Sequence, residues 1–202
     1  MARDPKNFDN LLGGNAKGLS DTQLKAHFTL YQGYVKKLNE IREKLGTADR
    51  SAPNYSFNDY SELRRREPVA YNGTVLHEMY FENIGDGSTQ PDEHVKKLIT
   101  ASFGSWDAWV ADAKAVLMSA HGWLVVQYDY SDGKLANNLV QSEHHVGLLA
   151  NVHAIVAVDA WEHAYFFDYQ AKKADYVANM VSGLNWDVLN KRLAQVGGSM
   201  AG

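Results

Sequence analysis

Apolar positions recur every three or four residues through much of the chain, the spacing typical of α-helices that bury one face. The clearest stripe begins after Ser20 and includes Leu24, Phe28 and Tyr31. The predicted helices cover residues 22–45, 56–66, 68–84, 163–180 and 186–196, with two more in 93–119 that are separated near Gly104. Residues 85–93 (GDGSTQPDE) are rich in turn residues and predict a linker.

The pattern changes after residue 120, where β-branched and aromatic residues become frequent. The predicted strands cover residues 123–130, 134–141 and 153–159. The first two flank Ser131-Asp132-Gly133, a turn signal that predicts a hairpin. The sequence therefore predicts an α+β fold, with an N-terminal antiparallel helical hairpin domain and a C-terminal α/β domain that holds a small three-stranded antiparallel sheet. We expect the boundary between residues 90 and 91, which gives domains of 1–90 and 91–202.

Composition narrows the possible chemistry. The 202 residues include no cysteine, which excludes disulfides, thiolate metal sites and thiol catalysis. The eight histidines and the carboxylates are then the natural metal ligands. The net charge of -4 argues against a general nucleic-acid binder. No apolar run approaches the ~20 residues that span a membrane, and the first ten residues lack the apolar core of a secretory signal. We expect a cytoplasmic protein with no nucleic-acid or membrane partner.

The densest chemical signal is DAWEHAY, residues 159–165. Asp159 ends an apolar run and His163 follows four residues later, so both side chains could converge on one metal ion if the chain turns from strand to helix between them. An aspartate that caps a helix, beside an interfacial histidine, fits the same spacing. The spacing alone leaves both interpretations open.

The longer segment DAWEHAYFFDYQAKKADYV (159–177) resembles the signature of the iron/manganese superoxide dismutase family. The resemblance implies that Asp159 and His163 bind the metal and that Trp161 lines the metal pocket. It also implies that Glu162 crosses a dimer interface to the metal-binding histidine of the other subunit. The segment LHEMYFENIG (76–85) is similar to a second family segment, whose histidine is a ligand, and this implies the same role for His77.

The segment AHFTLYQGYVKKLNEI (26–41) resembles the first metal-binding helix of the family, but with a shifted histidine. The family's ligand lies eight residues before the tyrosine that corresponds to Tyr34, a position that Ala26 occupies here. We expect His27, seven residues before Tyr34, to be the ligand. Seven residues amount to about 700°, so both side chains fall on nearly the same face of a regular helix. We therefore predict no π-bulge, with Leu30 and Tyr31 between them on that face.

Two further features concern proton delivery. Gly73 precedes His77 by four residues, and SEHH (142–145) resembles the segment that carries an outer-sphere histidine in family members with this glycine. The resemblance implies that His144 and Tyr34 assist proton transfer. The family's gateway His–Tyr pair is replaced by Leu30 and Phe166.

Together, the resemblance implies disproportionation of superoxide at one iron or manganese ion per subunit, in a homodimer or tetramer built through Glu162 and His163. A redox-inactive relative, acting as a metal-binding or interaction protein, is the alternative that the altered first helix suggests. A hydrolytic metalloenzyme lacks support, because His77-Glu78 is not followed by the second histidine of an H-E-x-x-H motif.

Overall fold

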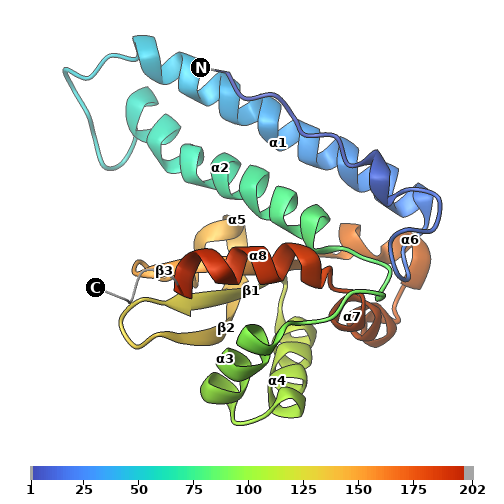
Figure 1. The fold of residues 1–202 in the computed structure, drawn as a ribbon. Coiled ribbons are helices and arrows are strands. Elements are labelled where there is room, and N and C mark those ends of the chain that lie inside the picture. The colour runs from blue at the N-terminus through green and yellow to red at the C-terminus, as the bar shows by residue number, and fades with distance from the viewer. Residues whose placement is uncertain (1, 198–202) are drawn as a thin grey trace.

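The computed structural model describes residues 2–197 of the chain (Figure 1). The elements of the first half are η1 (Asp9–Leu11), α1 (Asp21–Thr47), α2 (Asp59–Asn83), α3 (Glu93–Phe103) and α4 (Trp106–Ser119). Those of the second half are β1 (Gly122–Asp129), β2 (Lys134–Gln141), α5 (Ser142–His145), β3 (Val152–Asp159), η2 (Glu162–Ala164), α6 (Phe166–Tyr169), α7 (Lys173–Ser182) and α8 (Trp186–Gly197). The predicted fold class is confirmed, and the boundary at residue 90 stays a prediction.

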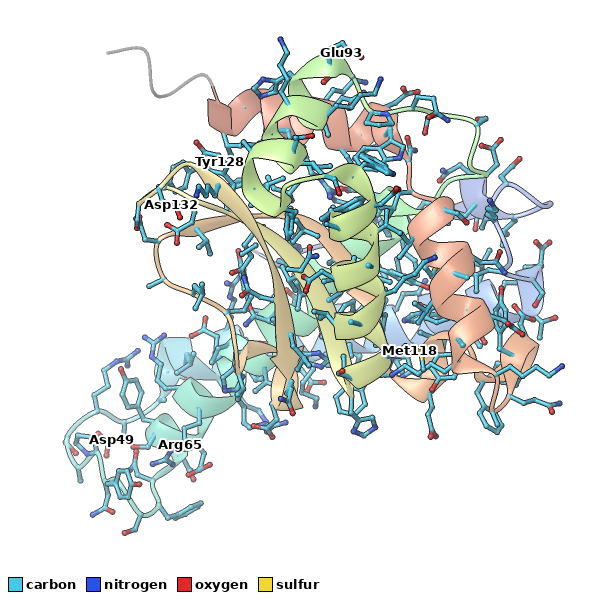
Figure 2. All side chains as sticks on the ribbon, turned by 90° about the horizontal axis from the view of Figure 1, so that it is seen from below. Asp49, Arg65, Glu93, Met118, Tyr128 and Asp132 are labelled. Atoms are coloured by element: carbon cyan, nitrogen blue, oxygen red, sulfur yellow. The ribbon has the colours of Figure 1, made fainter. Side chains whose placement is uncertain are left out.

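Helices α1 and α2 form a long antiparallel hairpin, whose tip projects from the rest of the molecule near Asp49 and Arg65 (Figure 2). Helix α1 is α-helical along its whole length, as the seven-residue spacing predicts. The predicted break before Pro68 is wrong, because α2 is continuous through it. Pro68 and Arg64 are both exposed, so water can reach the Arg64 carbonyl that lacks its usual N–H partner.

The sheet has the strand order β2-β1-β3, and both pairings are antiparallel. The central strand β1 is buried along nearly all of its length. Helix α4 packs against β1 and β2, α3 packs against β2, and α2 and α8 pack against β3. In Figure 2, Glu93 and Met118 mark the start of α3 and the end of α4 beside the hairpin that contains Tyr128 and Asp132. Strand β3 ends at Asp159, so the sheet delivers this carboxylate beneath the helical hairpin.

The predicted helix over 163–180 is wrong. The chain instead forms the short 3-10 helix η2, a single turn as α6, and α7 after a break at Gln170, which has a positive φ of 49°. Part of the cause is Gln23 of α1. Its side-chain amide hydrogen-bonds to the His163 carbonyl and the Phe167 N–H, which a continuous helix would pair with each other. The short helix α5, in which Glu143 and His144 have left-handed φ values of 57° and 65°, lies between two predicted strands, where the sequence predicts no element.

Over the described residues 2–197, no helix is long and apolar enough to cross a membrane.

Candidate metal centre

Four side chains from separate elements meet beneath the helical hairpin. His27 comes from α1, His77 from α2, Asp159 from the end of β3, and His163 from η2. Their potential ligand atoms all lie within 4.8 Å of one another. The Nε2 atoms of His163, His27 and His77 lie 3.2, 3.3 and 3.6 Å from Oδ2 of Asp159. The four residues that the sequence predicts as ligands are therefore brought together.

Backbone groups orient two of these side chains. The other carboxylate oxygen of Asp159, Oδ1, accepts a hydrogen bond of 2.8 Å from the Trp161 backbone N–H. The Nδ1 atom of His77 hydrogen-bonds to the Gly73 carbonyl one turn earlier. A carbonyl can only accept, so Nδ1 of His77 carries the proton and its Nε2 presents a lone pair toward Asp159. Outer-shell partners of this kind fix the tautomer of metal-binding histidines.

Burial sets the charge states of these groups. Burial lowers the pKa of His77 to about 3 and also lowers the pKa of His27, so both rings are neutral near pH 7. Burial by itself would raise the pKa of Asp159, but the hydrogen bond and charge of His163, together with His27, outweigh it and keep the pKa far below its usual range. Burial likewise opposes the ionised form of His163, yet the Asp159 carboxylate raises the pKa of His163 above its ordinary value. The centre thus combines one carboxylate with two neutral imidazoles, those of His27 and His77, whose lone pairs are available to a metal ion.

These residues fit a single metal ion. The Nε2 atoms of His27 and His77 are fully buried and have no hydrogen-bond partner among the described residues. Buried polar atoms are normally paired, because an unpaired one carries the full cost of desolvation. Two bare imidazole nitrogens facing one buried carboxylate oxygen are what a metal site requires. Three imidazoles and a carboxylate, with no thiolate, suit iron or manganese.

Tyr34, His144 and Trp123 form a hydrogen-bonded chain beside the centre. The Trp123 indole N–H donates to Nδ1 of His144 at 2.9 Å, and Nε2 of His144 lies 2.8 Å from Oη of Tyr34. An indole N–H can only donate, so Nδ1 of His144 is the acceptor. In the neutral ring Nε2 then carries the proton, and this N–H donates a hydrogen bond to Oη of Tyr34. Burial lowers the pKa of His144, which favours this neutral form.

The position of Tyr34 depends on its neighbours on α2. Its ring centroid lies 5.2 Å from that of His77, and a Cβ at Gly73 would overlap the Tyr34 ring. Tyr31 is buried on the same side of α1, whereas Leu30 is only partly buried. The strained turn that carries His144 is held in addition by an ion pair between Glu143 and Arg66 of α2.

Trp161 lies beside His163, the least buried of the four candidate ligands. The Trp161 ring is nearly parallel to that of His163, with centroids 6.5 Å apart, and packs against His121 at 4.2 Å. Glu162 and Phe166 are exposed, and 31% of the His163 side chain is accessible. This side of the centre is therefore open at the surface of one chain.

Sequence reasoning missed two residues that hold the backbone around the centre. Tyr176 donates a hydrogen bond of 2.5 Å from Oη to the Asp159 carbonyl. Gln23 contacts the backbone of the His163 segment with both atoms of its side-chain amide. A signal for Gln23 was present, because it is a polar residue one turn before His27 on the buried stripe of α1.

The chain is similar to proteins of one family. The C-terminal domain model of the iron/manganese superoxide dismutases matches residues 91–192. A protein of Aquifex pyrophilus named "Superoxide dismutase [Fe]" is 38% identical over 194 residues, which cover 94% of this chain and 90% of that protein. The Aquifex aeolicus protein of the same name is 38% identical, covering 91% of this chain and 88% of the relative. "Superoxide dismutase [Mn] 2" of Haloferax volcanii is 32% identical, covering 80% and 79%.

Proposed function

The chain belongs to the iron/manganese superoxide dismutase family, and we propose that it disproportionates superoxide to dioxygen and hydrogen peroxide at one iron or manganese ion held by His27, His77, Asp159 and His163. The convergence of three imidazole Nε2 atoms on Oδ2 of Asp159, two of them buried without another partner, is the observation that carries the proposal. The reaction turns two superoxide anions and two protons into one dioxygen and one hydrogen peroxide. When bound, the metal supplies one-electron redox chemistry between two superoxide anions.

The protein's own contribution to the reaction is the handling of protons. Because His144 donates to Oη of Tyr34, the hydroxyl hydrogen of Tyr34 is free to point toward the substrate. Burial raises the pKa of Tyr34, and the negative charge of Asp159 raises it further, so the hydroxyl stays protonated near neutral pH. Tyr34 is thus the proton donor in this proposal, and His144 orients it and is its nearest hydrogen-bonding partner. The Trp161 ring lies nearly parallel to the His163 ring and lines the centre beside it.

Elemental analysis of the purified protein, together with the rate of superoxide decay, tests the proposal. The wild type is expected to hold one iron or manganese ion per subunit and to accelerate the decay, and His163→Ala is expected to lose both properties. His94→Ala, at an exposed position of α3, is a matched control that should keep both. Full metal occupancy and activity in His163→Ala would refute the proposed ligand set. A wild type that holds metal without accelerating the decay would support the redox-inactive alternative.

We also propose a symmetric homodimer, or a tetramer built from it, in which Glu162 meets His163 of the second subunit. The exposure of Glu162 and Phe166, together with the open side of His163, supports this arrangement. Light scattering at micromolar concentration tests it, and a fully active monomer would contradict it. A cytoplasmic location remains a proposal, which fractionation of the native cells would test.

A further inference from the structure

Gln23 is a fully buried glutamine of α1 whose side-chain amide reaches across to the segment that carries His163. Its Nε2 donates a hydrogen bond of 2.6 Å to the His163 carbonyl, and its Oε1 accepts one of 3.1 Å from the Phe167 backbone N–H. A carbonyl can only accept and a backbone N–H can only donate, so the two partners fix the orientation of the amide. Both ends of a buried polar group are therefore satisfied by backbone atoms four residues apart.

These two backbone groups are the pair that an α-helix would join directly. In a regular helix the N–H of residue 167 donates to the carbonyl of residue 163. Here the Gln23 amide lies between them and replaces one helical hydrogen bond with two bonds to its side chain. Before the gap, the Tyr165 N–H donates to the Glu162 carbonyl, three residues earlier, as in a 3-10 helix. After the gap, α-helical bonds over four residues resume with the Tyr169 N–H and the Tyr165 carbonyl. The helix is interrupted at the point where His163 faces Asp159.

We propose that Gln23 is a positioning residue for His163, keeping the chain from continuing as a helix at this point and holding the imidazole toward Asp159. The inference rests on the proposed function, because it concerns a proposed metal ligand. Gln23 lies one turn before His27, so a single face of α1 provides one ligand and positions another. Figure 1 shows α6 beside the N-terminal end of α1, where this contact is made.

Two neighbouring hydrogen bonds, both made by Ser20, hold the first turn of α1 and therefore the Gln23 side chain in place. Ser20 caps α1 and its Oγ accepts from the Gln23 backbone N–H at 3.1 Å. The Ser20 backbone N–H in turn donates to Oδ2 of Asp168 in α6 at 2.7 Å. The first turn of α1 and the segment after His163 are therefore joined twice. Phe167, in contrast, has 64% of its surface exposed, so packing of its side chain contributes little to holding this segment.

The test compares metal-loaded holoenzymes of the wild type, Gln23→Met, Gln23→Asn and the control Gln32→Met. Methionine is close to glutamine in length but removes both hydrogen bonds, while asparagine is polar but too short to bridge both groups. Gln32 is exposed on the same helix. The readouts are the visible absorption spectrum of the bound metal, its reduction potential, and the rate at which a chelator removes it.

Gln23→Met is expected to shift the spectrum and the potential, and to lose metal to the chelator about 10- to 100-fold faster, as variants of outer-shell partners do. Gln23→Asn should change in the same direction by less, and it decides the question if Gln23→Met does not fold. Gln32→Met should match the wild type. A Gln23→Met holoenzyme that melts earlier but keeps the wild-type spectrum, potential and metal release would overturn the inference, because Gln23 would then be structural only. A wild type that binds no metal would instead refute the proposed function itself.

Discussion

Replacing Gly73 with alanine is a direct test of how closely Tyr34 must be placed. A Cβ at residue 73 would lie 2.4 Å from Cδ1, 2.7 Å from Cε1 and 2.9 Å from Cγ of the Tyr34 ring. Carbon atoms in ordinary contact are about 3.5 Å or more apart, so the ring has to move by about 1 Å. The bond between Tyr34 Oη and His144 Nε2 is 2.8 Å long. A displacement of this size stretches it beyond the roughly 3.2 Å limit of a good hydrogen bond.

The expected cost falls on activity more than on stability. Misplacing a reacting group by about 1 Å can cost up to about 100-fold, so we expect kcat for superoxide to fall about 10- to 100-fold. Overpacking costs about 1–3 kcal/mol, while alanine is favoured over glycine in a helix by about 1 kcal/mol. The net loss of unfolding free energy is then about 0–2 kcal/mol, or a decrease in Tm of less than about 8 °C for a chain of this length.

Superoxide decay after pulse radiolysis gives kcat, and thermal unfolding of the same sample gives Tm. Gly33→Ala is the matched control, because a Cβ at Gly33 on α1 meets no atom within 4 Å, although Gly33 is the neighbour of Tyr34. This control should gain up to about 1 kcal/mol from helix propensity and keep its kcat. Wild-type kcat in Gly73→Ala, with metal bound, would refute the reasoning that links the glycine to the placement of Tyr34.

Two other predictions concern stability. Burial by itself would raise the pKa of Glu82, but its hydrogen bonds with Lys6 and Arg192 outweigh burial and lower the pKa. The contribution of Glu82 to the unfolding free energy is therefore fully present above pH 4.5 and is lost as pH falls through the folded-state pKa. Glu82→Gln should make the acid loss of unfolding free energy shallower by about 1 kcal/mol or less, as urea titrations between pH 3 and 6 would show; an unchanged slope would contradict this. Tyr31→Phe removes the hydroxyl that donates to the buried Glu78 carboxylate at 2.9 Å, so urea unfolding should show a loss of about 1–3 kcal/mol, and no loss would mean that the carboxylate finds another donor.

Much of the fold could be predicted because the deciding information is local. The helical stripe of α1, the Ser-Asp-Gly turn and the β-branched strands each predict their element from neighbouring residues, and each is present. Pro68 misled the prediction because the penalty for an internal proline depends on whether water can reach the freed carbonyl, which is a tertiary property. The 163–180 segment failed for a related reason. Its periodicity is helical, and part of what interrupts it is a side chain about 140 residues earlier.

In the candidate centre, too, the ligands could be predicted from the sequence, while the residues that hold them through tertiary contacts could not. The resemblance identified His77, Asp159 and His163, the seven-residue spacing to Tyr34 identified His27 in place of Ala26, and the structure places the ligand-capable atoms of all four together. Sequence reasoning did not find Gln23 or Tyr176, because a single polar residue on an apolar stripe does not reveal which backbone group it contacts. The strained turn at His144 was equally hidden, since its left-handed φ is imposed by partners on β1, α1 and α2 rather than by a local glycine.

The seven-residue separation of His27 and Tyr34 has a structural consequence for the whole centre. Because α1 is regular, Gln23, His27, Tyr31 and Tyr34 follow one another at steps of four, four and three residues and face the same side. Gln23 holds the His163 backbone, and His27 offers an unpaired imidazole nitrogen. Tyr31 donates a hydrogen bond to Glu78, and Tyr34 hydrogen-bonds to His144. A bulge between His27 and Tyr34 would turn the two halves of this row apart by about 100°. The regular helix therefore lets one rigid face serve the site from Gln23 to Tyr34, which an eight-residue spacing on an unbroken helix could not do.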